Sequence, residues 1–181
     1  MNLLQAAQGV VPSACENLLL SIGHRAKKHT GFDIAPLIAR PQDFAAGIID
    51  FSGAALSGSV VFLSAFEFFA ASLSAGTKSP LRTQSAADWI KVRDVSMELS
   101  NQLLGRIKNQ LCKYGIVVEP SLPRAVSGYP LRVTVRERTV APHVYLGEGC
   151  EVFVWFEAVV KDASASTPPL ERIAEGDLVE F

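Results

Sequence analysis

The sequence predicts an α+β fold in which an antiparallel or mixed sheet packs against a few helices, one of which is long. Short apolar segments follow one another without helices between them, which favours antiparallel pairing. A segment that can stay helical without interruption extends from Ser85 to Tyr114. The length of 181 residues is close to that of one domain. We expect residues 1–161 to form this domain and residues 162–181 to be a tail that begins with a flexible linker.

The composition excludes several classes of function. A formal net charge of -1 with 19% charged residues offers no clustered excess of Lys and Arg for nucleic acid. The three cysteines form no CxxC pair and the three histidines have no ligand spacing, so we expect neither a disulfide framework nor a metal site. No apolar run is long enough to span a membrane. These features predict a cytoplasmic protein that binds no metal ion of its own.

The first element is a helix. Apolar residues recur at helical spacing from Val11, with Pro12 tolerated only near the helix start or as a kink. We expect this helix to end near residues 28–31, where the basic cluster of Arg25, Lys27 and Lys28 would suit the negative end of the helix dipole.

Three strands are predicted next, at Phe32 to Ile38, Phe44 to Phe51 and Gly58 to Leu63. Ser64 followed by Glu67 resembles a capping box, the reciprocal pairing of side chains and backbone at a helix start, and predicts a short helix of aromatic character. The connection from Ala75 to Gln84 is rich in turn residues, and we expect it to be mobile.

The long helix has its own start and stop signals. Ser85 and Asp88 form a second potential capping box, and Gly115 follows Tyr114 as a potential C-terminal cap. Beyond it the composition predicts strands at residues 116–118, 131–140 and 150–160. The last strand is apolar on both faces from Val152 to Phe156, so it is either central in the sheet or covered by a second subunit.

One face of the long helix is predicted to face the core. At about 100° per residue, a single apolar stripe contains Val92, Val95, Leu99, Leu103, Ile107 and Leu111. Cys112 lies beside this stripe, and we expect its thiol to be buried.

The opposite face of the helix breaks three local rules. Asp94 and Glu98 are like charges one turn apart, Asn101 is a mediocre helix former, and Gly105 costs about 1 kcal/mol relative to alanine. Lys108 continues the same line of residues. Local rules tend to be broken at functional sites, although solvated helix faces are also commonly rich in such polar residues.

The geometry suggests a use for this face. A carboxylate and an amide three positions apart project side by side, and a glycine one turn later leaves room for the backbone of another protein. An amide can donate and accept hydrogen bonds at once, so it can hold a water molecule in one orientation.

The run of residues 94–108, Asp-Val-Ser-Met-Glu-Leu-Ser-Asn-Gln-Leu-Leu-Gly-Arg-Ile-Lys, resembles the signature helix of the CheC, CheX and FliY phosphatases. In these proteins Glu, two residues and then Asn define the active site. The Asp, Gly and Lys resemble the CheX-like branch, and the order of elements extends the likeness over roughly residues 10 to 160.

The resemblance implies hydrolysis of the phospho-aspartate of a CheY-like response regulator. Asn101 would orient the attacking water and Glu98 would pair with a lysine of the partner, whereas Asp94, Gly105 and Lys108 would contribute to partner binding. The Mg²⁺ would belong to the response regulator. Because only one such motif is present, the resemblance to single-motif CheX-like members also implies a homodimer joined through its sheets.

Two alternatives remain open at this level. A non-catalytic CheX-like module could bind a receiver domain or another signalling partner without turnover. An enzyme acting on a small molecule would require a deep pocket lined by titratable groups.

Overall fold

The computed structural model describes residues 3–30, 43–74, 85–128, 141–147 and 150–161. The strand predicted at residues 32–38, the connection at 75–84, the strand predicted at 131–140 and the tail at 162–181 therefore lie outside the described residues. The elements follow the order α1 (Leu3–Ser21), β1 (Ala26–His29), β2 (Phe44–Ser52), β3 (Leu56–Ala65), α3 (Phe66–Ser74), α4 (Ala86–Cys112), β4 (Glu119–Pro120), β5 (Arg124–Gly128), β6 (His143–Gly147) and β7 (Cys150–Val160).

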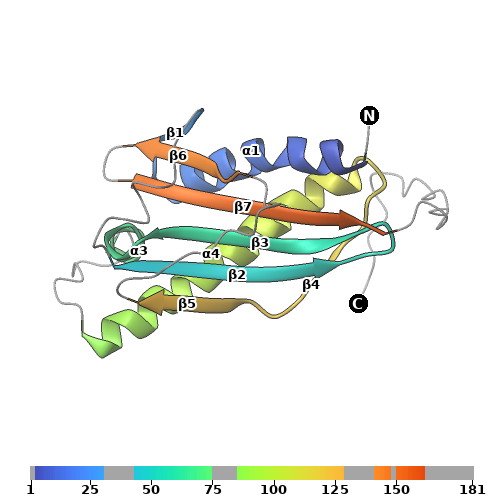
Figure 1. Ribbon diagram of the computed structural model, residues 1–181. Helices are drawn as coiled ribbons and strands as arrows, with labels where there is room; N and C mark the ends of the chain where they lie inside the picture. The colour runs from blue at the N-terminus through green and yellow to red at the C-terminus, as the bar shows by residue number, and fades with distance from the viewer. Residues whose placement is uncertain (1–2, 31–42, 75–84, 129–140, 148–149, 162–181) are drawn as a thin grey trace, which may run out of the picture.

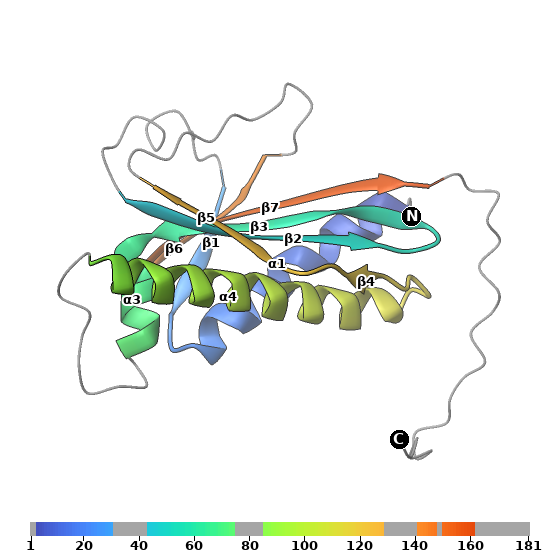
Figure 2. The ribbon, with the colours of Figure 1, turned by 90° about the horizontal axis from the view of Figure 1, so that it is seen from below.

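The strands within the described residues form one seven-stranded sheet in the order β1-β6-β7-β3-β2-β4, with β5 also paired to β2. Every described pairing is antiparallel. The described helices α1, α3 and α4 lie on one face of this sheet (Figure 2). The α+β fold with a long helix on an antiparallel sheet, as predicted from the sequence, is confirmed.

Helix α1 differs from its predicted bounds at both ends. It begins at Leu3 rather than near Val11, so Pro12 lies inside it. It ends at Ser21, and Gly23 follows with a φ of 84°, a left-handed conformation that glycine adopts without strain. The predicted end near residues 28–31 is wrong because residues 26–29 form the edge strand β1, where exposed lysines discourage pairing with other chains.

The strands predicted at residues 44–51, 58–63 and 150–160 are confirmed as β2, β3 and β7. The strand predicted at residues 116–118 is wrong, since Ile116 and Val118 are buried core residues that precede the short strand β4. Strands β1, β5 and β6 had no prediction.

The capping box predicted at Ser64 does not form. Ser64 is the ninth residue of β3, fully buried, and its hydroxyl donates to the backbone oxygen of Glu151 at 2.6 Å. Helix α3 begins two residues later at Phe66, whose backbone N–H donates to Asp43 O at 2.8 Å. The short aromatic helix itself is confirmed.

Strand β7 is central, which answers one of the two readings of its apolar sequence. It pairs with β6 on one side and β3 on the other. Val152, Val154 and Phe156 belong to the main core beneath the helices, whereas Phe153 and Trp155 belong to a second buried cluster. The alternation along β7 therefore places its apolar side chains in two cores, one on each face of the sheet.

Candidate functional site

The long helix α4 carries the candidate site, and its start is defined by the predicted capping box. The Ser85 hydroxyl accepts from the Asp88 backbone N–H at 3.2 Å, and the Asp88 carboxylate accepts from the Ser85 backbone N–H at 3.3 Å. The last helical residue is Cys112, and Gly115 follows with a φ of 72°. Both ends of the long helix were thus predicted to within two residues.

The inner face of α4 is the predicted apolar stripe with additions. Five of the six predicted residues are buried and Val95 is partly buried against the core. Leu104 is also buried, and so are Ser96 and Ser100, which the apolar pattern did not mark. Each serine hydroxyl donates to the backbone oxygen three residues earlier at 2.8 Å.

The two buried serines mark the closest approach of α4 to the sheet. A Cβ atom added to Gly47 of β2 would lie 1.9 Å from the backbone oxygen of Ser96 and 2.8 Å from the Ser100 hydroxyl oxygen. Only glycine fits there, because atoms in close-packed interiors do not approach so closely. Gly47, Ser96 and Ser100 therefore form a contact, here called the glycine seat, that sets the height of α4 on the sheet.

The outer face of α4 comprises Asp94, Glu98, Asn101, Gly105 and Lys108. Asp94, Glu98 and Asn101 are exposed, and Gly105 and Lys108 are partly exposed. The helix is continuous through all five positions. At about 100° per residue, their directions fall within roughly 80° of one another, so they form one straight line along the helix. The structure brings together all five site residues predicted from the sequence.

Asn101 and Glu98 differ in how their side chains are held. The Asn101 amide has no hydrogen-bond partner within the described part of the chain. The Glu98 carboxylate accepts a hydrogen bond at Oε1 from Gln102 Nε2 at 2.8 Å, which restrains it on the helix surface. Gln102 was not predicted as a site residue, although its spacing four residues after Glu98 is the spacing at which helical side chains meet.

Gly47 and Gly105 differ in whether packing requires a glycine. Gly47 is required by the fold, as described above. Around Gly105 an added Cβ would meet no atom within 4 Å beyond the helix's own neighbouring backbone. Packing within the described residues therefore gives no reason for glycine at position 105.

Lys108 is paired within the chain. Its Nζ lies 3.2 Å from both carboxylate oxygens of Glu119 in β4. The Lys108 side chain is 31% exposed and that of Glu119 is 69% exposed, so the pair contributes at most about 1 kcal/mol to stability. The ion pair mainly fixes position, because it joins the C-terminal part of the outer face to β4.

The two flanks of α4 face different elements. Arg106 donates from Nη2 to the Ser21 hydroxyl at 2.9 Å, and Ser13 of α1 donates to Gln110 Oε1 at 2.8 Å. One flank therefore contacts α1, and β4 and β5 lie along the other flank (Figure 2). Lys108, at the edge of the outer face, contacts Glu119 of β4 on that side. The outer face lies between the two flanks and points away from the sheet.

The described cysteine and histidine side chains lie outside the outer face of α4. Cys15 of α1 is buried, and burial raises the pKa of its thiol to about 12. Cys112 is exposed at the end of α4, so the prediction that its thiol is buried is wrong. Burial lowers the pKa values of His24 and His143. Within the described ranges, no three His, Cys, Asp or Glu residues are placed to hold a metal ion.

The described pocket is also separate from the outer face. It has a volume of about 560 Å³ and lies where the end of α1 meets β1, lined by Glu16, Leu20, His24, Arg25, Ala26, Lys27 and Lys28. None of the five outer-face residues contributes to it. No helix within the described residues is both long and apolar enough to cross a membrane.

Comparisons of the sequence with family models and with curated proteins give no match. Comparisons of the structure with solved structures do give matches. The chemotaxis protein CheX from Vibrio vulnificus superposes with a TM-score of 0.64 at 16% identity, over 88% of this chain and 97% of that chain. A CheC-like superfamily protein from Shewanella sp. PV-4 gives 0.65 at 17% identity, over 87% and 99%.

A third similar structure contains a partner. It is the complex of CheX with CheY, BeF3 and Mg²⁺ from Borrelia burgdorferi, with a TM-score of 0.61 at 13% identity, covering 87% of this chain and 97% of that chain. At these identities the likeness establishes the fold. The chain therefore has the CheX-like fold that the resemblance of residues 94–108 implies.

Proposed function

We propose that this chain accelerates hydrolysis of the phospho-aspartate of a CheY-like response regulator in a chemotaxis-type pathway. The observation that carries the proposal is the outer face of α4. There the exposed Asn101 amide, without a hydrogen-bond partner in the described residues, stands one turn from the Glu98 carboxylate. A CheX of the same fold occurs in a complex with CheY, which supports this class of partner.

Asn101 acts on water in this proposal. An amide inserted beside the phosphoryl group donates one hydrogen bond and accepts another, and so fixes a water molecule in line with the bond to be broken. Phosphoryl transfer depends mainly on positioning and charge stabilisation. A single well-placed amide therefore suffices on this side of the interface, because the Mg²⁺ and the phospho-aspartate belong to the response regulator.

Glu98 acts on the partner. Its carboxylate pairs with a lysine of the receiver, while the hydrogen bond from Gln102 restrains it on the helix surface one turn from Asn101. Two contacts one helical turn apart define both the position and the angle of docking. Asp94 and Gly105 extend the same docked surface, the first by charge and the second by close backbone approach.

The outer face is one side of a continuous helix and contributes no residue to the pocket between α1 and β1. One exposed side of a helix suits insertion into the active-site cleft of another protein, whereas sites for small molecules are concave. A homodimer, as in single-motif CheX-like proteins, would present two such faces.

The test is the timed loss of phosphate from CheY-like receivers of the same cell, phosphorylated with acetyl phosphate. The wild-type chain should shorten the phosphate lifetime. Asn101→Ala should remove the acceleration, and Glu98→Gln, which keeps an acceptor for Gln102, should raise the receiver concentration needed for half-maximal rate.

The matched control is Asn109→Ala, which removes the exposed asparagine eight residues later on the same helix, about 80° around the helix axis from Asn101 and outside the five outer-face residues. It should leave the rate unchanged. Receivers that bind the chain but keep their normal phosphate lifetime would instead establish the non-catalytic binding module.

A further inference from the structure

One leucine of the described chain stands almost entirely in solvent. Leu122, between β4 and β5, is 87% exposed, more than any other large apolar residue described. Single exposed leucines are common on protein surfaces, so exposure alone identifies nothing. Two further features distinguish Leu122, namely how firmly its backbone is held and where it lies relative to the outer face of α4.

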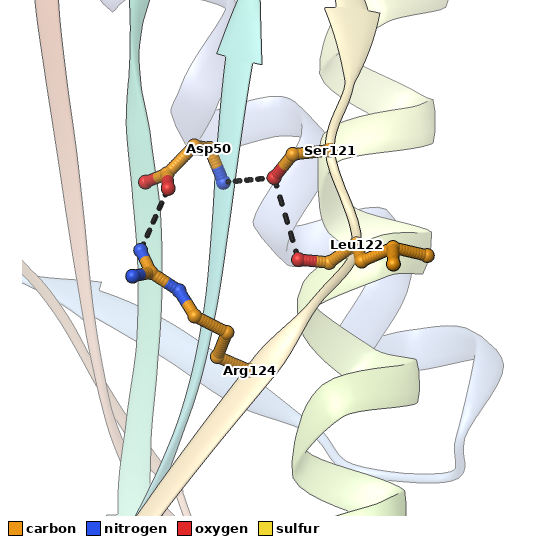
Figure 3. Close-up of polar contacts among 4 residues, drawn as sticks. All are labelled: Asp50, Ser121, Leu122 and Arg124. Carbon is orange, nitrogen blue, oxygen red and sulfur yellow. Dashed lines mark hydrogen bonds and ion pairs between the residues drawn. The ribbon is translucent and has the colours of Figure 1, made fainter.

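The segment around Leu122 is fastened to β2 through Asp50. Ser121 donates its backbone N–H to Asp50 O at 2.9 Å, and the Asp50 N–H donates to the Ser121 hydroxyl at 3.2 Å. That hydroxyl donates in turn to Leu122 O at 3.3 Å, and Arg124 binds the Asp50 carboxylate at 2.7 Å. Figure 3 shows the contacts of the Ser121 hydroxyl and of Arg124, and the Leu122 side chain pointing away from Asp50.

Two contacts already described show which residues of α4 lie beside which residues of β2. The glycine seat places Gly47 of β2 beside residues 96–100 of α4. Five residues further along β2, Ser52 pairs with Glu119, which contacts Lys108. Strand β2 and helix α4 therefore run in the same direction.

Along the length of α4, Leu122 lies between these two contacts. Its neighbour Ser121 is bonded to Asp50, which lies between Gly47 and Ser52 on β2. With rises of about 3.3 Å per strand residue and 1.5 Å per helix residue, Asp50 is level with the middle of the outer face, near Asn101 and Gly105.

We propose that Leu122 is an apolar contact for the same response regulator that docks on the outer face of α4. This inference rests on the proposed function. A receiver that places its active site over Asn101 also covers the flank of α4 that faces β4 and β5, and Leu122 projects beside that flank. A leucine on a fixed backbone loses little conformational freedom on binding, so its burial contributes to affinity rather than to ordering the loop.

The different roles of Leu122 and Asn101 predict different kinetic effects when each side chain is removed. Leu122 touches neither the phosphoryl group nor the water, so it contributes equally to the ground state and the transition state. Its removal should change the KM for the phosphorylated receiver and leave kcat unchanged, in contrast to Asn101→Ala, which should change kcat. An apolar contact should also be insensitive to salt.

The experiment compares Leu122→Ser with Leu20→Ser, since Leu20 is a 64% exposed leucine on α1. For each variant we would measure kcat and KM with a phosphorylated CheY-like receiver, and the dissociation constant for the same receiver by titration. Leu122→Ser should raise the KM and the dissociation constant about 10-fold (about 1.4 kcal/mol), Leu122→Met should restore them, and Leu20→Ser should match the wild type.

The outcomes separate this inference from the proposed function. A Leu122→Ser variant with wild-type KM and affinity, in a chain that does accelerate dephosphorylation, would overturn the inference alone. A wild-type chain that binds the receiver without turnover would overturn the proposed function, and the titration would still decide the role of Leu122. A wild-type chain that binds no receiver would overturn both.

Discussion

A substitution at Gly47, in the glycine seat beneath α4, should displace the candidate site without changing any residue of the outer face. Gly47→Ala adds one methyl group on the strand β2, at the point where the backbone oxygen of Ser96 would lie 1.9 Å from it. Contacts below 3.0 Å are essentially never seen for real Cβ atoms, so the helix and the strand must separate by more than 1 Å at this point. The neighbour that blocks the methyl group is backbone, which cannot rotate away.

The magnitude follows from the cost of overpacking. Inserting a methyl group into a well-packed interior typically destabilises a protein by about 1–3 kcal/mol, and the rigid neighbour favours the upper half of that range. With a urea dependence of roughly 2 kcal/mol per molar, the urea midpoint should fall by about 1–1.5 M. Because a misplacement of about 1 Å can cost about 100-fold in rate, receiver dephosphorylation should slow as well.

Gly105→Ala is the matched control, with the opposite expected sign. Its Cβ meets open space, and alanine is favoured over glycine in a helix by about 1 kcal/mol. This variant should be more stable in urea, yet should bind the receiver less tightly where the partner backbone approaches. A Gly47→Ala chain as stable as the wild type would refute the contact that sets the height of α4.

Three further predictions concern stability and reactivity. Leu103→Ala removes a fully buried side chain beneath the outer face and should cost about 2–5 kcal/mol in urea unfolding, whereas a cost below 1 kcal/mol would contradict the inner face described above. In a Cys150→Ser background, Ellman's reagent should titrate the exposed Cys112 in the native protein and Cys15 only after unfolding, and equal rates for the two thiols would be the opposite result. Burial lowers the pKa values of His24 and His143, so their contribution to stability is present above the unfolded value near 6.5 and is lost as the pH falls below it. The urea midpoint should therefore fall between pH 7.5 and pH 5, by less in a double His24→Gln, His143→Gln variant, and an equal fall in both proteins would contradict this assignment.

The long helix was predictable because its signals are local. The capping box at Ser85, the apolar spacing and the terminal Gly115 all act within a few residues of one another. The outer face followed from the same periodicity, since the direction of each side chain on a regular helix depends only on its position. Strands β2, β3 and β7 were also predictable, because their apolar runs are long and bounded by turn residues.

The failures have tertiary causes. Residues 26–29, Ala-Lys-Lys-His, carry no strand pattern, and they become β1 only because β6 offers an unpaired edge. Pro12 allowed either a helix start or a kink, and the start predicted near Val11 is wrong because α1 begins at Leu3 and extends through the proline, with buried residues on both sides of it. At Ser64 a local capping pattern was overridden by a hydrogen bond to Glu151 on a neighbouring strand, 87 residues away. The ion pair of Lys108 with Glu119 likewise depends on the folded arrangement of α4 and β4.

The measurement that tests the central claim most directly is the rate of phosphate loss from a phosphorylated receiver saturated with this chain, in the wild type, Asn101→Ala and Asn109→Ala. Saturation removes differences in affinity, so the rate reports only what happens inside the complex. We expect Asn109→Ala to match the wild type and Asn101→Ala to slow the bound receiver about 100-fold. An Asn101→Ala chain that releases phosphate at the wild-type rate would show that the exposed amide orients no water.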